Sequence, residues 1–250
     1  MTRQQAENRI QELRKILWEN SRKYYVENAP VISDYDYDHL MYELADLENQ
    51  YPDLITPDSP TRKVGSDLEN SDENGKTVPS ARKEFAQYPH KYPMLSLGNT
   101  YNIGEIEDFV ARASKTISAP FTYSCELKFD GTAICLTYRN GVLFRALTRG
   151  DGVIGDDVTE NVRHISNIPE KLRGAGYPEE FEIRGEILMP YSAFDKLNEE
   201  RLQNEDQPFA NPRNAASGSL KLLDPKEVGR RGLWCTLYHI PSPNVNFATH

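Results

Sequence analysis

A lysine between two carboxylates marks the stretch Ser124–Gly131, which reads Ser-Cys-Glu-Leu-Lys-Phe-Asp-Gly. If this stretch is a β-strand, side chains alternate between its faces, so Glu126, Lys128 and Asp130 share one face. A salt-bridged strand surface is the commoner use of such residues. The alternative is a nucleophilic lysine, which attacks phosphorus once it has lost its proton. Gly131 would then let a nucleotide approach the backbone closely.

The composition bounds the class of protein. The chain has 250 residues, 38% hydrophobic and 27% charged, which is ordinary for a soluble globular protein of one large domain with a small appendage. The net charge of -9 argues against an extended nucleic-acid footprint, since phosphate binding needs a basic face. No secretion signal or membrane span is evident, so a cytoplasmic protein without membrane contact is expected. The three cysteines are predicted to be reduced core residues, and no Cys-x-x-Cys indicates zinc.

Two helices are expected at the start of the chain. Apolar residues at helical spacing predict a helix over residues 3 to 28, and Pro30 prevents its continuation. Ser33 has the position of an N-cap for a second helix, with Asp36 in the capping-box place. One face of that helix carries Tyr37, Leu40, Met41, Leu44 and Leu47.

A polar cluster lies at the start of the second helix. Asp34, Tyr37 and Asp38 follow the i, i+3, i+4 spacing and therefore form one patch. Two interpretations stay open. The acids can complement the positive helix N-terminus while Tyr37 packs on the first helix. Alternatively, with the ring of Tyr24, they can bind a cationic aromatic group such as a nicotinamide nucleotide.

The remaining sequence predicts an α+β fold with a largely antiparallel sheet, because strands and helices do not alternate as in parallel α/β folds. We expect a helical module at 1–65, a proline-rich linker at 66–95 and a main domain at 96–250. Asn140-Gly141 is a two-residue hairpin turn. In the main domain we expect helices near 103–117 and 191–204, and strands at 123–130, 133–139, 142–148, 181–189 and 233–240.

Several of these elements should bury apolar side chains. The helix near 103–117 is expected to bury Ile106, Phe109, Val110, Ala113 and Ile117. The strand at 123–130 is expected to bury Cys125, Leu127 and Phe129. The helix at 191–204 is expected to bury Phe194, Leu197 and Leu202.

Further motifs could bind a phosphate. Arg149 opens an Arg-Gly-Asp-Gly turn that can present it to an anion. Gly185, between Arg184 and Glu186 in a strand, suggests a close approach by backbone or ligand. Asn211-Pro212-Arg213-Asn214 precedes a helix start, where an anion could lie.

Taken in order, these motifs resemble the N-terminal portion of bacterial NAD-dependent DNA ligases along nearly the whole chain. The matching strings are Tyr24–Pro30, Ser33–Asp38, Pro93–Leu97, Glu126–Gly131, Thr148–Gly152, Arg184–Glu186 and Asn211–Leu220. The resemblance implies a small helical module that recognises nicotinamide mononucleotide (NMN), followed by an adenylation (nucleotidyltransferase) domain.

The resemblance also implies residue roles. Lys128 resembles the catalytic lysine that takes AMP from NAD and releases NMN. Glu126 and Tyr238 correspond to adenine contacts, and Arg149 and Arg213 to arginines near phosphate and ribose. Glu186 corresponds to an acid that binds the ribose or Mg²⁺. The NMN contacts correspond to Tyr24, Asp34, Tyr37 and Asp38, and the residues lining the nucleotide pocket to Ser96 and Leu97.

The sequence also departs from the family. Tyr25 stands where many members carry histidine, and Lys221 where many carry arginine. The downstream Asp-Gly-hydrophobic-hydrophobic-x-Lys strand is missing, which implies a truncated adenylation domain. We therefore expect a monomer that binds NAD, NMN or AMP, adenylylates poorly or not at all, and binds DNA weakly. Sealing of nicked double-stranded DNA in replication and repair is expected of the intact enzyme, with Zn²⁺ only in the domains absent here.

Two other classes stay open. An ATP-using nucleotidyltransferase, of the RNA ligase or capping type, shares Lys-x-Asp-Gly and Arg-Gly-Glu but not the module around Tyr24 and Asp38. A non-catalytic domain that binds a partner would use the Lys128 strand as plain surface.

Overall fold

The structure is a computed structural model that describes residues 2–25, 31–62, 85–243 and 245. The first two helices form a pair, as predicted: α1 (Arg3–Tyr25) and α2 (Asp34–Gln50) share a small apolar core. Ser33 is the N-cap of α2, and its hydroxyl accepts a hydrogen bond of 3.1 Å from the Asp36 backbone N–H. The core contains Ala6, Ile10, Leu13 and Leu17 from α1 with Leu44 and Leu47 from α2.

A buried carboxylate fastens the chain that follows α2. Glu48 accepts hydrogen bonds from Ser59 Oγ at 2.6 Å, from Thr61 Oγ1 at 2.5 Å and from Arg14 Nη2 at 2.6 Å. Burial alone would raise the pKa of Glu48, but these three hydrogen bonds lower it below its ordinary value. The hydrogen bonds from Ser59 and Thr61 hold the 3₁₀ turn η2 (Pro60–Arg62) near the helix pair. Arg14 Nη2 also donates to the Leu54 carbonyl of the turn η1 (Pro52–Leu54) at 2.8 Å.

The main domain is built on a four-stranded antiparallel sheet in the order β3-β2-β5-β6. The strands are β2 (Thr132–Arg139), β3 (Val142–Thr148), β5 (Glu180–Leu188) and β6 (Trp234–His239). β2 and β3 form the predicted hairpin, in which Asn140 and Gly141 have positive φ angles of 49° and 73°. The expected α+β class with an antiparallel sheet is confirmed.

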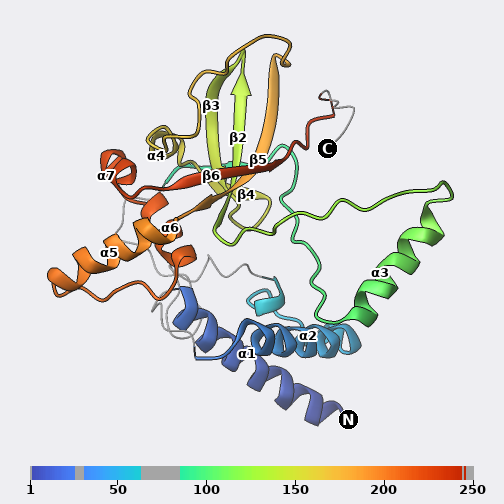
Figure 1. Cartoon of the computed structure of the whole chain (residues 1–250). Coiled ribbons are helices and arrows are strands. Elements are labelled where there is room, and N and C mark those ends of the chain that lie inside the picture. The colour runs from blue at the N-terminus through green and yellow to red at the C-terminus, as the bar shows by residue number, and fades with distance from the viewer. Residues whose placement is uncertain (1, 26–30, 63–84, 244, 246–250) are drawn as a thin grey trace.

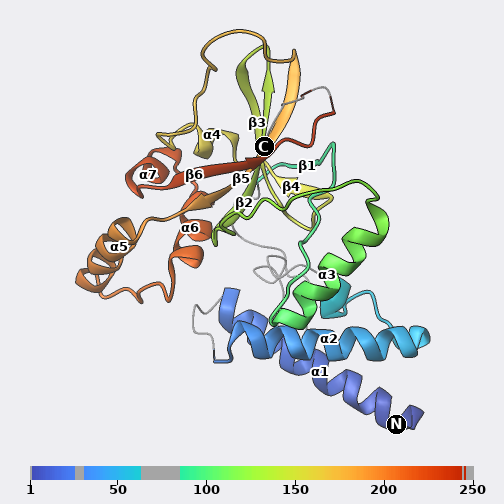
Figure 2. The same ribbon diagram turned by 45° about the vertical axis from the view of Figure 1, so that its right-hand side comes forward.

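One face of this sheet carries the main core. Ile134, Leu136 and Tyr138 of β2 pack with Ile187 of β5 against short helices. These helices lie to the same side of the sheet in both views (Figures 1 and 2). They are α4 (Thr159–Val162), α5 (Tyr191–Gln203), α6 (Pro212–Leu220) and α7 (Pro225–Arg230). In α5 the expected burial of Leu197 is confirmed, but Leu202 is exposed, because it lies on the solvent side near the end of that helix.

A second, two-stranded sheet ties part of the expected linker to the main domain. β1 (Gln87–Pro89) pairs antiparallel with β4 (Ile154–Asp156). Further along, the Met94 N–H donates to the Gly152 carbonyl at 2.8 Å. Residues 85–94 are therefore bound to the main domain rather than free of it.

The prediction for the stretch 123–130 is wrong. No residue between Ile117 and Asp130 lies in a helix or strand, and within the described ranges no strand pairs with this stretch. Leu127 is 80% exposed, and Phe129 and Cys125 are exposed too, whereas Cys135 and Cys235 are buried as expected. A strand needs a hydrogen-bonding neighbour, and an alternating pattern does not supply one.

The helix near 103–117 exists, but its expected burial is wrong as well. α3 (Ile103–Thr116) begins at the N-cap Asn102, whose side chain accepts a hydrogen bond from the Glu105 N–H. Ile106, Phe109, Val110 and Ile117 are all exposed. The reason is its position, since α3 stands apart from the four-stranded sheet in both views (Figures 1 and 2).

No helix of the described chain is both long and apolar enough to cross a bilayer.

Candidate functional site

The predicted site begins where the Lys128 stretch enters the sheet. Gly131 immediately precedes β2, and a Cβ there would collide with the carbonyl oxygen of Ile187 and with the side chain of Leu188. The glycine thus lets β5, rather than a ligand, approach the backbone. This contact brings the end of the Glu-Leu-Lys-Phe-Asp stretch beside Glu186 of β5.

Four charged groups, Lys128, Asp130, Glu186 and Arg213, lie near one another at this junction. Arg213, near the N-terminus of α6, donates from Nη1 to Asp130 Oδ1 at 3.1 Å. Burial raises the pKa of the Glu186 carboxyl, while the positive charges of Arg213 and Lys128 lower it in part. Lys128 and Arg213 are thus close enough to Glu186 for their charges to act on it. Two cations and two carboxylates thus share the junction, and Lys128 is exposed.

Arg149 and Tyr238 lie near each other. Arg149 Nη2 donates to Ser96 Oγ at 3.0 Å, so the Arg-Gly-Asp-Gly turn contacts the Pro93–Leu97 segment. Burial raises the pKa of Tyr238, and the nearby carboxylate of Glu186 raises it further, while Arg184 and Arg149 lower it. Tyr238 of β6 therefore lies within electrostatic reach of Glu186 and Arg149.

Two predicted residues are exposed. Glu126 is exposed, and its carboxylate accepts a 3.4 Å hydrogen bond from Ser124 Oγ. Leu97 is exposed as well.

The cluster on α2 makes different contacts. The Tyr37 hydroxyl is 2.6 Å from Ser21 Oγ of α1, and its ring packs on the helix-pair core. Asp38 accepts hydrogen bonds from Asn99 Nδ2 at 2.9 Å and from the Tyr101 hydroxyl. The hydrogen bond to Asp38 raises the pKa of Tyr101 to about 12. The side chains of Tyr24 and Asp34 lie outside the described residues.

Sequence reasoning missed two groups here. Asn99 and Tyr101 connect the main domain to α2 through Asp38, and no motif or spacing marks them. The second is Asp130, which the sequence presents as a neighbour of the lysine and which forms an ion pair with Arg213 in the structure. Its place in Lys-x-Asp-Gly was the available signal.

The residues at the junction could bind Mg²⁺ only if the bound nucleotide supplied further oxygen ligands. Within the described part of the chain, no group of three or more His, Cys, Asp or Glu side chains could hold a metal. Glu186 offers a carboxylate beside Lys128, so Mg²⁺ would need phosphate oxygens and water to complete its oxygen shell.

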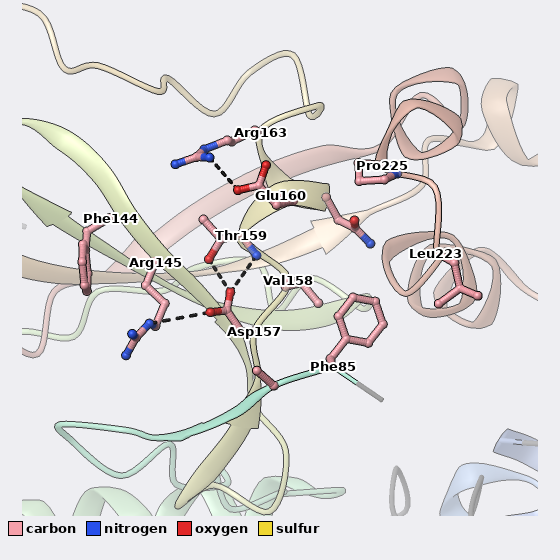
Figure 3. Close-up of a pocket in the computed structure, with 12 residues that line it drawn as sticks. Phe85, Phe144, Arg145, Asp157, Val158, Thr159, Glu160, Arg163, Leu223 and Pro225 are labelled. Atoms are coloured by element: carbon pink, nitrogen blue, oxygen red, sulfur yellow. Dashed lines mark hydrogen bonds and ion pairs between the residues drawn. The ribbon is translucent and has the colours of Figure 1, made fainter. Parts of the chain in front are cut away.

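A cavity of about 490 Å³ lies elsewhere, beside β3, α4 and the start of α7. Figure 3 shows its charged side chains already paired: Arg145 with Asp157 at 3.7 Å, and Arg163 with Glu160 at 2.6 Å. None of the predicted nucleotide-binding residues lines it. The cavity is therefore not the predicted adenylate site.

Comparison with known proteins gives the same family for both parts of the chain. Residues 3–65 match the model of the DNA ligase-like, N-terminal NAD+-binding domain, and residues 82–250 match that of the NAD-dependent DNA ligase adenylation domain. Among similar proteins, a DNA ligase of Parabacteroides distasonis is 50% identical over 98% of this chain and 35% of its own length. DNA ligases of Bacteroides fragilis and Cytophaga hutchinsonii are 49% and 44% identical over 96% and 98% of this chain. The chain spans 34% and 35% of the length of these two relatives. The chain therefore belongs to the NAD-dependent DNA ligase adenylation-domain family and carries the N-terminal NAD+-binding domain as well.

Proposed function

We propose that this chain is the adenylation region of an NAD-dependent DNA ligase and that Lys128 accepts AMP from NAD. The observation that carries the proposal is the junction of Lys128 with Glu186 and the Asp130–Arg213 ion pair, in a chain of this family. Cations beside an exposed lysine suit a reaction in which charge develops on phosphate oxygens.

The reaction balances as a substitution at phosphorus. The neutral Lys128 amine attacks the adenylyl phosphorus, an N–P bond forms, and the P–O bond to NMN breaks. NMN leaves with the bonding electrons, and the lysine nitrogen gives up its extra proton. Arg149 and Arg213 would stabilise the phosphate charge, and Mg²⁺ near Glu186 would supply further charge shielding. In the whole enzyme AMP would then pass to a DNA 5′-phosphate and the nick would be sealed.

We also propose a division of labour along the chain. The module at 1–65 would select NAD by binding its NMN half through Tyr24, Asp34, Tyr37 and Asp38, and the main domain at 96–250 would bind the AMP half. Glu126 and Tyr238 would contact adenine, and Ser96 and Leu97 would line its pocket. For Asp38 this requires exchange of its contacts with Asn99 and Tyr101 for the ligand. We expect a cytoplasmic monomer, and we expect this 250-residue chain to bind nicked DNA weakly.

The test is transfer of labelled adenylate. The chain is incubated with Mg²⁺ and either NAD or ATP labelled in the adenylyl phosphate, and peptides are sequenced. Label from NAD on Lys128, absent in Lys128→Ala and absent with ATP, is expected, at low stoichiometry. Label from ATP would favour the ATP-using alternative. A folded chain that neither binds AMP nor takes label would favour the partner-binding alternative and overturn the proposal.

A further inference from the structure

Arg184 makes contacts that the proposed chemistry does not use. It lies on β5 two residues before Glu186 and is only 9% exposed. Its guanidinium crosses to another segment, where Nη1 donates to the Pro93 carbonyl at 3.0 Å and Nη2 to the Tyr92 carbonyl at 2.5 Å. A planar guanidinium fork can serve two successive carbonyls at once, whereas a lysine ammonium is a point charge on a flexible stem.

The segment held in this way leads directly to Ser96. After Pro93 comes Met94, which is buried and donates its N–H to the Gly152 carbonyl at 2.8 Å. Ser96 Oγ then accepts the hydrogen bond from Arg149. The segment is therefore fixed by β5 at its start and by the Arg-Gly-Asp-Gly turn further on.

The same guanidinium is near the adenine-side residue of the proposed site. Arg184 and Arg149 both lie close enough to Tyr238 to act on its ionisation, as does Glu186. Arg184 pairs in register with Cys135 of β2 and His239 of β6, so it occupies the middle of the sheet rather than its edge. Its place is fixed on both sides by strands, which suits a group that must hold another segment in register.

We propose that Arg184 is a positioning residue for nucleotide binding: it fixes the Tyr92–Leu97 segment so that Ser96 and Arg149 face the adenylate beside Lys128. This rests on the proposed function. Arg184 touches no reacting atom in this account and acts through the segment that it holds.

The experiment compares Arg184→Lys with Arg145→Lys. Both substitutions keep the positive charge. Arg145 is a matched control because it is a partly buried arginine on β3 of the same sheet, and its guanidinium lies 3.6 Å from the centre of the Tyr88 ring, before the Tyr92–Leu97 segment. AMP binding is measured by calorimetry, and adenylate transfer is measured as a function of NAD concentration. Thermal unfolding shows which variants are folded.

Arg184→Lys loses one of the two hydrogen bonds that hold the segment. We expect AMP binding to weaken about tenfold, because part of the binding free energy must then fix the segment again. KM for NAD should rise, while the rate at saturating NAD changes little, because Lys128 and Glu186 are untouched. Arg145→Lys should leave both values unchanged.

Unchanged AMP affinity in folded Arg184→Lys would overturn the inference, and so would an equal loss in Arg145→Lys. Either result leaves the proposed function intact, since wild-type binding remains. A wild-type chain without AMP binding and without label overturns the proposed function itself. If Arg184→Lys unfolds, Ser96→Ala tests the same segment, and unchanged affinity there counts against the inference.

Discussion

Two regions of the main domain meet at Gly131, and they are held in different ways. On one side, β5, β6 and α6 belong to the packed sheet and its helices, where Ile187 and Leu220 have no exposed surface. On the other side, α3 and the chain up to Asp130 expose most of their apolar side chains. The proposed nucleophile and Asp130 lie on the second region, whereas Glu186 and Arg213 lie on the first.

This difference shows which contacts locate Lys128. It has no strand partner within the described chain, so its position depends on the Gly131 contact with β5 and on the Asp130–Arg213 ion pair. An exposed ion pair contributes little stability, typically about 0.2–1 kcal/mol. The steric fit at Gly131 is therefore the firmer of the two.

The largest effect is expected in the packed region. Leu136→Ala removes a side chain with no exposed surface from the centre of β2, and such truncations cost about 2–5 kcal/mol because they leave a cavity. Urea unfolding followed by circular dichroism measures the loss. A cost below about 1 kcal/mol would mean that the sheet core is looser than its burial indicates.

The strands of the packed region could be predicted because their signals are local. β-Branched and aromatic residues bounded by the Asn140-Gly141 turn predict β2 and β3, and these two strands pair with each other across that turn. The pattern at 123–130 is equally regular, yet it forms no strand. Periodicity tells which face can be buried, but not whether a neighbour is present to bury it.

The site was predictable only in part, for a related reason. The spacing of Lys128 and its flanking acids indicated chemistry, but their approach to Glu186 and Arg213 depends on how distant segments pack. The ordered motifs supplied that grouping through resemblance. The contacts of Asp38 with Asn99 and Tyr101 had no such signal, because they join parts of the chain with no shared pattern.

A smaller effect is expected at the junction. Gly131→Ala places a methyl group against the Ile187 carbonyl and should cost about 1–3 kcal/mol, the usual penalty of overpacking. It should also displace Lys128 and reduce adenylate transfer. Gly98→Ala is the matched control, because no atom lies within 4 Å of the position its Cβ would take. Equal unfolding midpoints for the two variants would show that the junction is not tightly fitted.

A pH-dependent effect is expected at Glu186. Burial raises its pKa above the ordinary value of 4.5, so between that value and the raised one the folded chain binds more protons than the unfolded chain. Stability contributed by this group therefore falls as pH rises through this window, by about 1.4 kcal/mol per unit of pKa displacement.

Glu186→Gln removes this titration. The variant should gain stability relative to the wild type as pH rises from about 4 to about 7, while losing adenylate transfer. Urea unfolding of both proteins across that range measures the difference. If the stability of the variant minus that of the wild type stays constant or falls as pH rises, the raised pKa of Glu186 is contradicted.

The smallest effect is expected on α3, and it tests the exposed region directly. Ile106→Ala and Phe109→Ala each remove an apolar side chain that is already exposed, so little buried area is lost. Alanine is also the better helix former, which offsets part of any loss. The free energy of unfolding should therefore change by less than about 0.5 kcal/mol, against the much larger cost of Leu136→Ala. Binding of a fluorescent apolar dye should fall in both variants, because contiguous exposed apolar surface attracts such dyes. A loss approaching that of Leu136→Ala would show that this face of α3 is buried in solution, and the contrast between the two regions would then be wrong.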